Sequence, residues 1–323
     1  MVVALGPNVT VDGLVSLIQT QGTIPSSPTL LAPATIINFL DNEMRGNVFP
    51  LVKSLKEEYW VVSLSNPIIS TQSAYPIPYR ATGAALRMVS MVDNNGNLLK
   101  LTRYEPEDTQ FPLIPYGSPY FPLGFYLQDN SVVLYPPVAT NYTSYTLQFK
   151  YERRPSNLVS SSACGQVTSF NQGASTVTLN FVPTAWTTST TVDVINNFPP
   201  FNSIADDVVI TNIAGLTLTL SIPSAYTSTF WTAIANNFWV SQSMTTPIPQ
   251  IPYEAFPYLA QLGLKRCMQA LGDVQGIKDA DETLKTIAMD LKSLLTPRVE
   301  GSPKVLAGRG GIFDYGRNSL GSW

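Results

Sequence analysis

The hydrophobic pattern of the chain changes its period twice, and this change limits the folds that the chain can adopt. Apolar residues recur every three or four positions over residues 1–58 and again over 248–296, which predicts amphipathic helices at both ends. Between them, short runs of β-branched and aromatic residues alternate with polar ones, as is typical of antiparallel strands. The chain is therefore predicted to be an α+β protein. Its two helical ends are expected to pack together as a core, with mainly antiparallel β-domains between them.

Capping and breaking residues predict three short helices in the first segment. Thr10 or Asp12 can cap the first helix, and Pro33 stands where a first-turn proline belongs in the second. Gly46 is expected to end this second helix, and a third is expected over residues 48–57. Helices this short need tertiary packing to be stable.

The strand-rich stretch divides into two parts by composition. Residues 59–159 carry two hairpin signals, with turns at Asn95-Gly96 and at Asp129-Asn130. Residues 160–247 are dense in Thr and Ser and contain no Lys, Arg or Glu. Their only charged residues are Asp193, Asp206 and Asp207. This composition predicts a second β-domain with hydroxyl-rich faces.

The C-terminal segment 248–296 is predicted to be a helix pair that completes the helical core. Its first helix is expected from about Glu254 to Leu271, and Gly272 can end it in the left-handed conformation. The second is expected from about Ile277 to Leu295, where apolar spacings of three and four predict one buried stripe, Leu294 included. Residues 297–323 are then expected to form an extended tail.

Composition excludes several classes of function. Charged residues make up 13% of the chain and the net charge is −3, so a broad electrostatic grip on nucleic acid is not expected. The sequence contains no histidine, which removes the commonest general base and most zinc sites, and no cofactor or metal is expected. Cys164 and Cys267 lie outside any CxxC pair and are interpreted as buried thiols, although a disulfide between them stays open.

Neither a signal-peptide pattern nor an apolar run of about 18 residues is evident in the sequence. The protein is therefore expected to be soluble and made in a reducing cytoplasm.

Three adjacent pairs of acids are the candidate catalytic carboxylates. They are Glu57-Glu58, Glu107-Asp108 and Asp206-Asp207. A glycoside hydrolase needs only two carboxylates, so the lack of histidine does not exclude one. However, Asp206 and Asp207 are expected to start a strand, where adjacent side chains point to opposite faces. The other two pairs are expected at a helix end and in a proline-bounded loop. We therefore expect no enzymatic activity.

The tail combines glycines with aromatic and arginine side chains. The candidate partner-binding residues are Arg309, Phe313, Tyr315, Arg317 and Trp323. Disordered tails are normally poor in aromatics, so binding to a partner would account for them. A frayed end with chance aromatics stays open as an alternative. The single RGG-like stretch at residues 308–311 is a weak signal for RNA binding.

Two parts of the chain resemble a known family. Residues 33–61 and the stretch YPIPYRA at 75–81 are similar to the opening helices and first strands of bacteriophage head-to-tail adaptors, also called connector or head completion proteins. Phe39-Leu40-Asp41 and Glu58-Tyr59 carry much of this likeness. Residues 248–273 resemble the start of the C-terminal helix pair of the same proteins. In all, the resemblance extends over residues 30–160 and 248–300.

The resemblance implies a structural virion protein that joins the portal to the tail. Such proteins form a ring, usually of twelve copies, and the C-terminal tail docks on the portal. Tail or nozzle proteins are the other implied partners, and synthesis takes place in the host bacterial cytoplasm. The resemblance implies no partner for residues 160–247 and leaves contact between the ring lumen and DNA open. The alternatives are another virion component, such as a tail-nozzle or minor capsid protein, or a β-rich polysaccharide-degrading enzyme.

Overall fold

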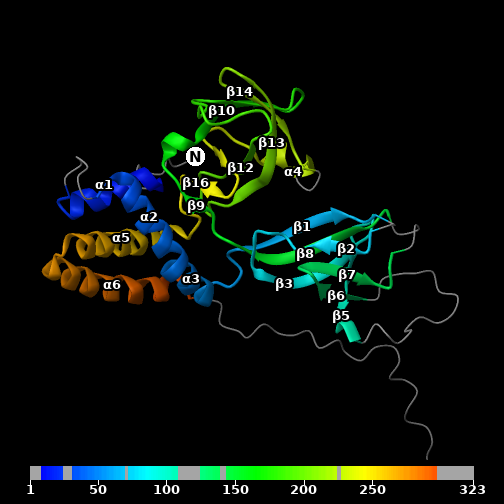
Figure 1. Ribbon diagram of the computed structural model, residues 1–323, viewed down its shortest axis with the longest axis horizontal. Coiled ribbons are helices and arrows are strands. Elements are labelled where there is room, and N and C mark those ends of the chain that lie inside the picture. Colours follow the sequence, from blue (N-terminus) through cyan, green and yellow to red (C-terminus); the bar gives the residue numbers. More distant parts are fainter. Residues whose placement is uncertain are drawn as a thin grey trace, which may run out of the picture.

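Helices, a closed β-barrel and a pair of sheets form three bodies side by side in the computed structural model (Figure 1). The structure describes residues 9–24, 31–69, 72–107, 124–138, 143–223 and 227–296. The mixed α and β content with several antiparallel sheets confirms the predicted fold class.

The N-terminal helices begin where the sequence predicts. Helix α1 (Val11–Gln21) is capped by Thr10, whose hydroxyl accepts a hydrogen bond from the Gly13 amide at 3.1 Å. Helix α2 (Pro33–Glu43) has its proline in the first turn.

The expectation that Gly46 ends the second helix is wrong. The chain continues through a π-helical turn, η2 (Met44–Val48), directly into α3 (Phe49–Leu55). Met44 and Val48 are completely buried, whereas Gly46 is exposed. The wider turn keeps both apolar side chains in the core, so packing outweighs the poor helix propensity of the glycine.

The C-terminal helices follow a short 3₁₀ turn, η6 (Tyr253–Ala255). Helix α5 (Phe256–Leu271) ends at Gly272, which has φ +73° as predicted, and α6 (Val274–Leu295) follows. Leu294, predicted to lie in the buried stripe of α6, is 56% exposed. The stripe is narrower than expected because only one side of α6 faces the other helices: its buried residues are Ala280, Leu284, Leu291 and Leu295.

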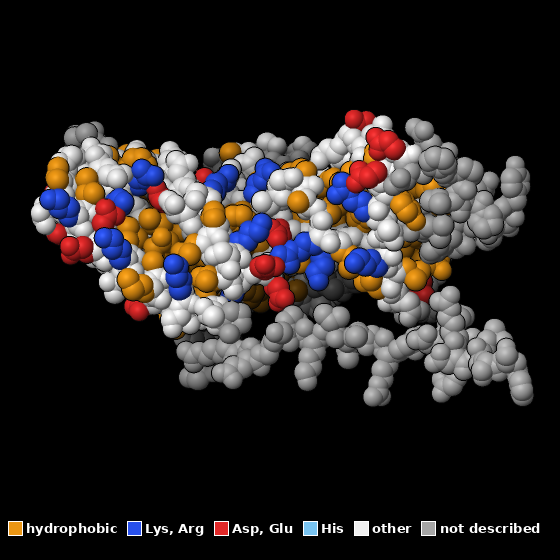
Figure 2. Space-filling view, turned by 90° about the horizontal axis from the view of Figure 1, so that it is seen from below, with side chains coloured by type: hydrophobic (Ala, Val, Ile, Leu, Met, Phe, Trp, Pro, Cys, Tyr) orange, Lys and Arg blue, Asp and Glu red, His pale blue; other side chains and the backbone are white. Residues whose placement is uncertain are grey.

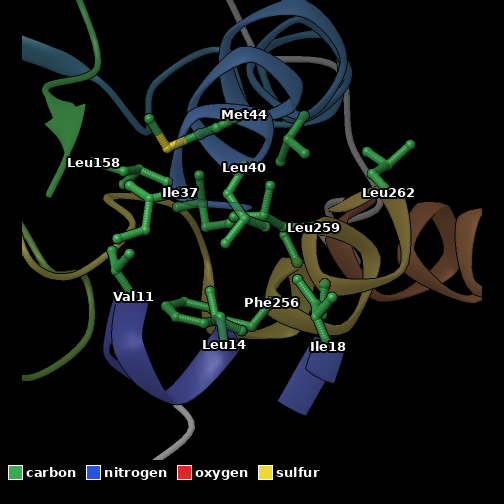
Figure 3. Close-up of a cluster of buried hydrophobic side chains, with 14 of the residues drawn as sticks. Val11, Leu14, Ile18, Ile37, Leu40, Met44, Leu158, Phe256, Leu259 and Leu262 are labelled. Atoms are coloured by element: carbon green, nitrogen blue, oxygen red, sulfur yellow. The ribbon is translucent and has the colours of Figure 1, made fainter. Parts of the chain in front are cut away.

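Helices from both ends of the chain share one hydrophobic core. Figure 3 shows side chains of α1, α2 and α5, among them Leu14, Leu40 and Leu259, pointing toward one another. The helices come close at Gly263, where an added Cβ would lie 2.7 Å from Leu40 and 2.8 Å from Ile18. Small residues at such a crossing allow the backbones to approach each other.

Two mainly antiparallel sheets enclose a second core. The first consists, in order, of β1 (Val61–Pro67), β8 (Thr146–Arg153), β3 (Ala81–Val92) and β4 (Leu98–Lys100). The second consists of β2 (Ala74–Pro76), β7 (Ser131–Tyr135), β6 (Gly124–Gln128) and β5 (Thr102–Arg103), of which β5 and β6 are parallel. Both hairpin turns are confirmed: Gly96 has φ +82°, and Asp129 and Asn130 have φ +47° and +57°.

The third body is a closed six-stranded barrel. Its strands, in order around the barrel, are β10 (Gly165–Asn171), β11 (Thr176–Leu179), β14 (Thr217–Ser221), β13 (Ser203–Ala214), β12 (Thr191–Ile195) and β15 (Trp239–Gln242). Its core includes Trp186 and, from helix α4 (Thr227–Ala233), Phe230. Closure leaves no free sheet edge within the barrel.

The chain enters and leaves the barrel at one place, beside the helices. Strand β9 (Asn157–Leu158) pairs in parallel with β16 (Thr245–Thr246). The amide of Leu158 donates a hydrogen bond to the Asp41 carboxylate of α2 at 2.9 Å. These contacts fix the base of the barrel to the helical body.

Candidate functional site

The guanidinium group of Arg80 joins the paired sheets to the barrel. Arg80 immediately precedes β3 and is only 3% exposed. Its Nη1 and Nη2 atoms donate to both oxygens of Asp193 at 2.9 and 2.8 Å. Its Nε and Nη2 atoms also donate to Asp207, at 3.2 and 2.7 Å. One side chain therefore binds two carboxylates of another body in the paired geometry that arginine favours.

A second arginine and a third carboxylate extend the cluster. Arg153, at the end of β8, is also buried and places Nη2 2.8 Å from Oδ1 of Asp206. Nη1 of Arg80 lies 3.4 Å from the same oxygen, and the Ser203 hydroxyl donates to it at 2.6 Å. The three acids are the only charged residues of 160–247, and each forms an ion pair with an arginine of the paired sheets.

A β-bulge brings the two adjacent acids to one site. Val192 pairs with Val208 and Val194 with Ala205, so Asp193 of β12 lies opposite both residues of the Asp206-Asp207 pair. Asp207 also has a left-handed φ of +58°. Two sequence-based expectations are thus wrong: the pair lies inside β13, not at its start, and both side chains reach Arg80. Strand β13 begins earlier than expected because Ser203 already pairs with Ile195 of β12. The bulge breaks the alternation of faces on which the second expectation depended.

Polar groups around the arginine hold the carboxylates in place. The hydroxyls of Tyr79 and Ser243 donate to Oδ1 of Asp207 at 2.5 and 2.6 Å. The backbone amides of Asp207 and Met244 donate to the two oxygens of Asp193, each at 3.0 Å. Hydrogen bonds of this kind offset the cost of burying ionised groups.

The surroundings of Asp193 and Asp207 shift the pKa values of these two carboxyl groups in opposite directions. Burial, followed by the charge of Asp206, raises the pKa of Asp193. Burial also acts to raise the pKa of Asp207, but hydrogen bonds from Arg80, Ser243 and Tyr79 bring it below its ordinary value. Such a divided pair can mark an acid and a base in an enzyme. Here Asp193 is fully buried with both oxygens hydrogen-bonded, so the geometry favours fixing the two bodies over proton transfer to a substrate.

A small cleft lies beside the cluster, between the first sheet and the barrel. Its volume is about 240 Å³, and Tyr79, Tyr151 and Asp207 contribute to its lining. The cleft runs along the junction between the first sheet and the barrel.

Among the described residues, Glu57, Glu58 and Glu107 do not join a comparable cluster. Glu57 contacts Nη2 of Arg87 at 3.2 Å, and Glu58 is exposed. Glu107 is exposed as well, while Asp108 lies outside the described residues.

Both cysteines are confirmed as buried free thiols. Burial, together with the nearby charge of Asp12, raises the pKa of Cys164 to about 12, and burial raises that of Cys267 to about 11. Thiols with such values are poor nucleophiles at neutral pH. Across the described part of the chain, no three residues of the His, Cys, Asp and Glu types are arranged to hold a metal ion.

An apolar groove crosses the helical body. We call it the helical groove: it has a volume of about 570 Å³ and is formed by α1, α5 and α6 together with residues just before α1 and α5. Its lining residues are Val9, Leu14, Leu17, Gln21, Tyr253, Glu254, Phe256, Pro257, Ala260, Gln261, Thr283, Ile287 and Leu294. A second depression of about 810 Å³, formed by residues 55–59 and 294–296, adjoins it at Leu294.

Hydrophobic side chains are also exposed between the charged ones at this end of the molecule, at the left of Figure 2. Tyr253 and Leu294 in the helical groove are each more than half exposed. Exposed apolar surface of this kind is typical of docking sites.

The predicted partner-binding residues of the tail all lie outside the described residues. They are Arg309, Phe313, Tyr315, Arg317 and Trp323. The described chain ends at Thr296, which lines the depression next to the helical groove.

Comparison with models of known protein families gave no match, and neither did comparison with curated proteins. Within the described residues, none of the helices is both long enough and apolar enough to cross a membrane.

Sequence reasoning missed the arginine cluster. The three acids stand alone in an otherwise uncharged stretch, and this isolation is the available signal in the sequence. A lone acid between valines, as in Val192-Asp193-Val194, is costly to bury unless a cation meets it. Burial of Asp193 therefore requires a basic side chain from elsewhere in the chain, and in this structure that side chain is Arg80.

Proposed function

We propose that this protein is a structural adaptor of a tailed bacteriophage virion, which forms a ring between the portal and the tail. The proposal starts from the resemblance of residues 30–160 and 248–300 to head-to-tail adaptors. The ring is built from copies of this chain, with the portal on one side and tail or nozzle proteins on the other.

One observation carries the proposal furthest: the buried ion-pair cluster between the paired sheets and the barrel. A protein that joins two large assemblies must hold its own parts at a fixed angle. Arg80 and Arg153 do this by binding Asp193, Asp206 and Asp207 across the junction. Because these acids face the junction, the remaining surface of the barrel carries no formal charge and is rich in hydroxyls. Neutral surfaces of this kind suit close packing against other proteins.

The C-terminal tail is the proposed portal-binding element. Phe313 and Tyr315 would supply buried anchors, with Trp323 as a third. Arg309 and Arg317 would contribute where carboxylates of the portal meet them. A ring presents one tail per copy, so many weak contacts add to a strong attachment.

Electron microscopy of the purified protein mixed with the portal of the same virus tests the proposal. A ring of copies bound to the narrow end of the portal is the expected result. Attachment only to a tail tip or to the capsid shell would favour the other virion roles. Hydrolysis of a glycan or peptide substrate that is lost on Glu107→Gln substitution would overturn the structural reading in favour of an enzyme.

A further inference from the structure

The helical groove has the size and lining of a site for a short apolar peptide segment. Its floor consists of side chains such as Leu14, Leu17 and Ile287, and its volume of about 570 Å³ is within the range of ligand-binding pockets. An apolar groove left open to water is unfavourable, because removing its apolar lining from water lowers the free energy.

The point at which the described chain ends suggests the occupant. Leu294 lines the helical groove and also the adjoining depression, which Thr296 lines as well. The chain that follows contains the apolar and aromatic stretch Ile312-Phe313-Asp314-Tyr315. We propose that in the free protein this stretch, residues 312–315, occupies the helical groove of its own chain.

The connection is long enough. Residues 297–311 can extend over about 50 Å at about 3.3 Å per residue. On α6 the groove extends from Leu294 back to Thr283, which is about 16 Å at 1.5 Å per residue. The tether can therefore reverse direction and lay the aromatic stretch along the groove. Tethering also gives an effective concentration on the order of millimolar, which favours the chain's own segment over a free competitor.

Charge favours the same pairing. Residues 297–323 contain four basic side chains and two acidic ones, for a net side-chain charge of +2. The helical groove and the adjoining depression are lined by three acids and one lysine, for a net charge of −2. Those residues are Lys56, Glu57, Glu58 and Glu254. The basic residues lie on both sides of residues 312–315, whose own charged residue is Asp314. Opposite charge therefore steers the tail as a whole toward the acids and does not fix the register of the segment in the groove.

This inference extends the proposed function, because the same aromatic stretch is the proposed portal-binding element. Seated in the free protein, the segment is shielded from non-specific contacts. Docking on the portal would then transfer it and uncover the groove.

The test uses full-length chains and a fluorescein-labelled peptide of residues 305–323. The parent chain should bind the peptide at least tenfold more weakly than the Phe313→Ala/Tyr315→Ala chain, whose own segment no longer competes. A Leu320→Ala chain, altered in the tail outside the stretch, should behave like the parent. Equal peptide affinity for the parent and the double variant would overturn the proposal.

A matched pair on α6 locates the binding surface. Ile287 lines the helical groove, whereas Met289 is 68% exposed and does not line it. Placed in the Phe313→Ala/Tyr315→Ala chain, Ile287→Asp should reduce peptide affinity at least tenfold and Met289→Asp should change it by less than twofold. Circular dichroism confirms that each variant is folded. Equal effects of the two substitutions would count against this site.

Sedimentation of the parent chain separates the chain's own segment from that of a second copy. A dimer that the Phe313→Ala/Tyr315→Ala substitutions abolish would show that the segment binds a neighbour and would overturn the proposal. No portal is present in these assays. Failure here therefore leaves the adaptor role standing, and failure to bind the portal leaves this groove assignment standing.

Discussion

Arg80 is the residue on which the junction between the paired sheets and the barrel depends most. Replacing it by methionine keeps much of its length but leaves Asp193 buried without its main cation. Breaking a buried pair from one side typically costs about 3–5 kcal/mol. We expect Arg80→Met to lower the free energy of unfolding of the barrel and its junction by this amount, measured by urea denaturation.

Arg87 provides the matched control. It forms ion pairs with Glu57 and Glu152 but is one-third exposed. Solvent screens such pairs, so Arg87→Met should cost less than about 1 kcal/mol. Equal losses of unfolding free energy for the two variants would show that the buried ion pairs stabilise the protein no more than the exposed ones.

The lowered pKa of Asp207 predicts a loss of stability in acid. A carboxylate whose pKa is lowered by folding stabilises the protein above its unfolded value, about 3.9, and this contribution disappears as pH falls through the folded pKa. Arg80, Tyr79 and Ser243 donate the hydrogen bonds that lower it. Asp193, with its raised pKa, acts in the opposite sense in both parent and variant.

We therefore expect Asp207→Asn to destabilise the protein at pH 7 and to flatten the decline in stability below about pH 4. Thermal unfolding of the parent and the variant between pH 2.5 and pH 7 measures this difference. Parallel curves for the two proteins would contradict it.

The residue scale is also where the sequence was least informative. The three acids stand out in the sequence, but their arrangement around one site depends on a bulge that sets Asp193 opposite both Asp206 and Asp207. Nothing local in the sequence marks that bulge. The partner Arg80 lies 113 positions from Asp193, so only the tertiary fold brings them together.

At the scale of elements, local signals predicted most helix ends and turns. Thr10, Pro33 and Gly272 act where the capping rules place them. Thr10 and Gly272 hydrogen-bond backbone groups of their own turns, whereas Pro33 lacks an N–H at a position where that group would have no partner in the helix. Gly46 did not end its helix, because the burial of Met44 and Val48 outweighs local propensity. The exposure of Leu294 was unpredictable for a related reason: how wide a stripe is buried depends on which neighbours the helix has.

Two glycines allow a test of the helix packing. Gly263→Val would place side-chain atoms against Leu40 and Ile18 at the crossing of α1, α2 and α5, and overpacking of this kind costs about 1–3 kcal/mol. Gly46→Ala meets no atom within 4 Å and should instead stabilise the protein by about 0.5–1 kcal/mol through lower backbone entropy in the unfolded state. Chemical denaturation of both variants measures the contrast. A stabilising Gly263→Val would show that the helices can move apart at little cost.

At the scale of the whole molecule, the three bodies divide the charges unequally. Residues 160–247 carry three acids and no basic residue, and all three acids form ion pairs at the junction with the paired sheets. The rest of the barrel surface therefore carries hydroxyl, amide and apolar groups and no formal charge. Contacts between uncharged groups of this kind are not weakened when salt screens electrostatic interactions.

This division predicts how an assembled ring responds to salt. Between 0.15 M and 1 M salt the screening length falls from about 8 Å to about 3 Å, which weakens exposed ion pairs and leaves apolar contacts intact. If the barrel supplies the subunit contacts of the proposed ring, rings assembled on the portal should keep their subunits over this range, as measured by sedimentation and negative-stain microscopy. A designed variant makes the expectation sharper. Thr211→Lys and Thr219→Lys place charges at barrel positions outside the cluster, so they should make ring assembly salt-dependent if they lie in the contact. Release of subunits from the parent ring at moderate salt would instead assign the subunit contacts to the charged helices or the paired sheets.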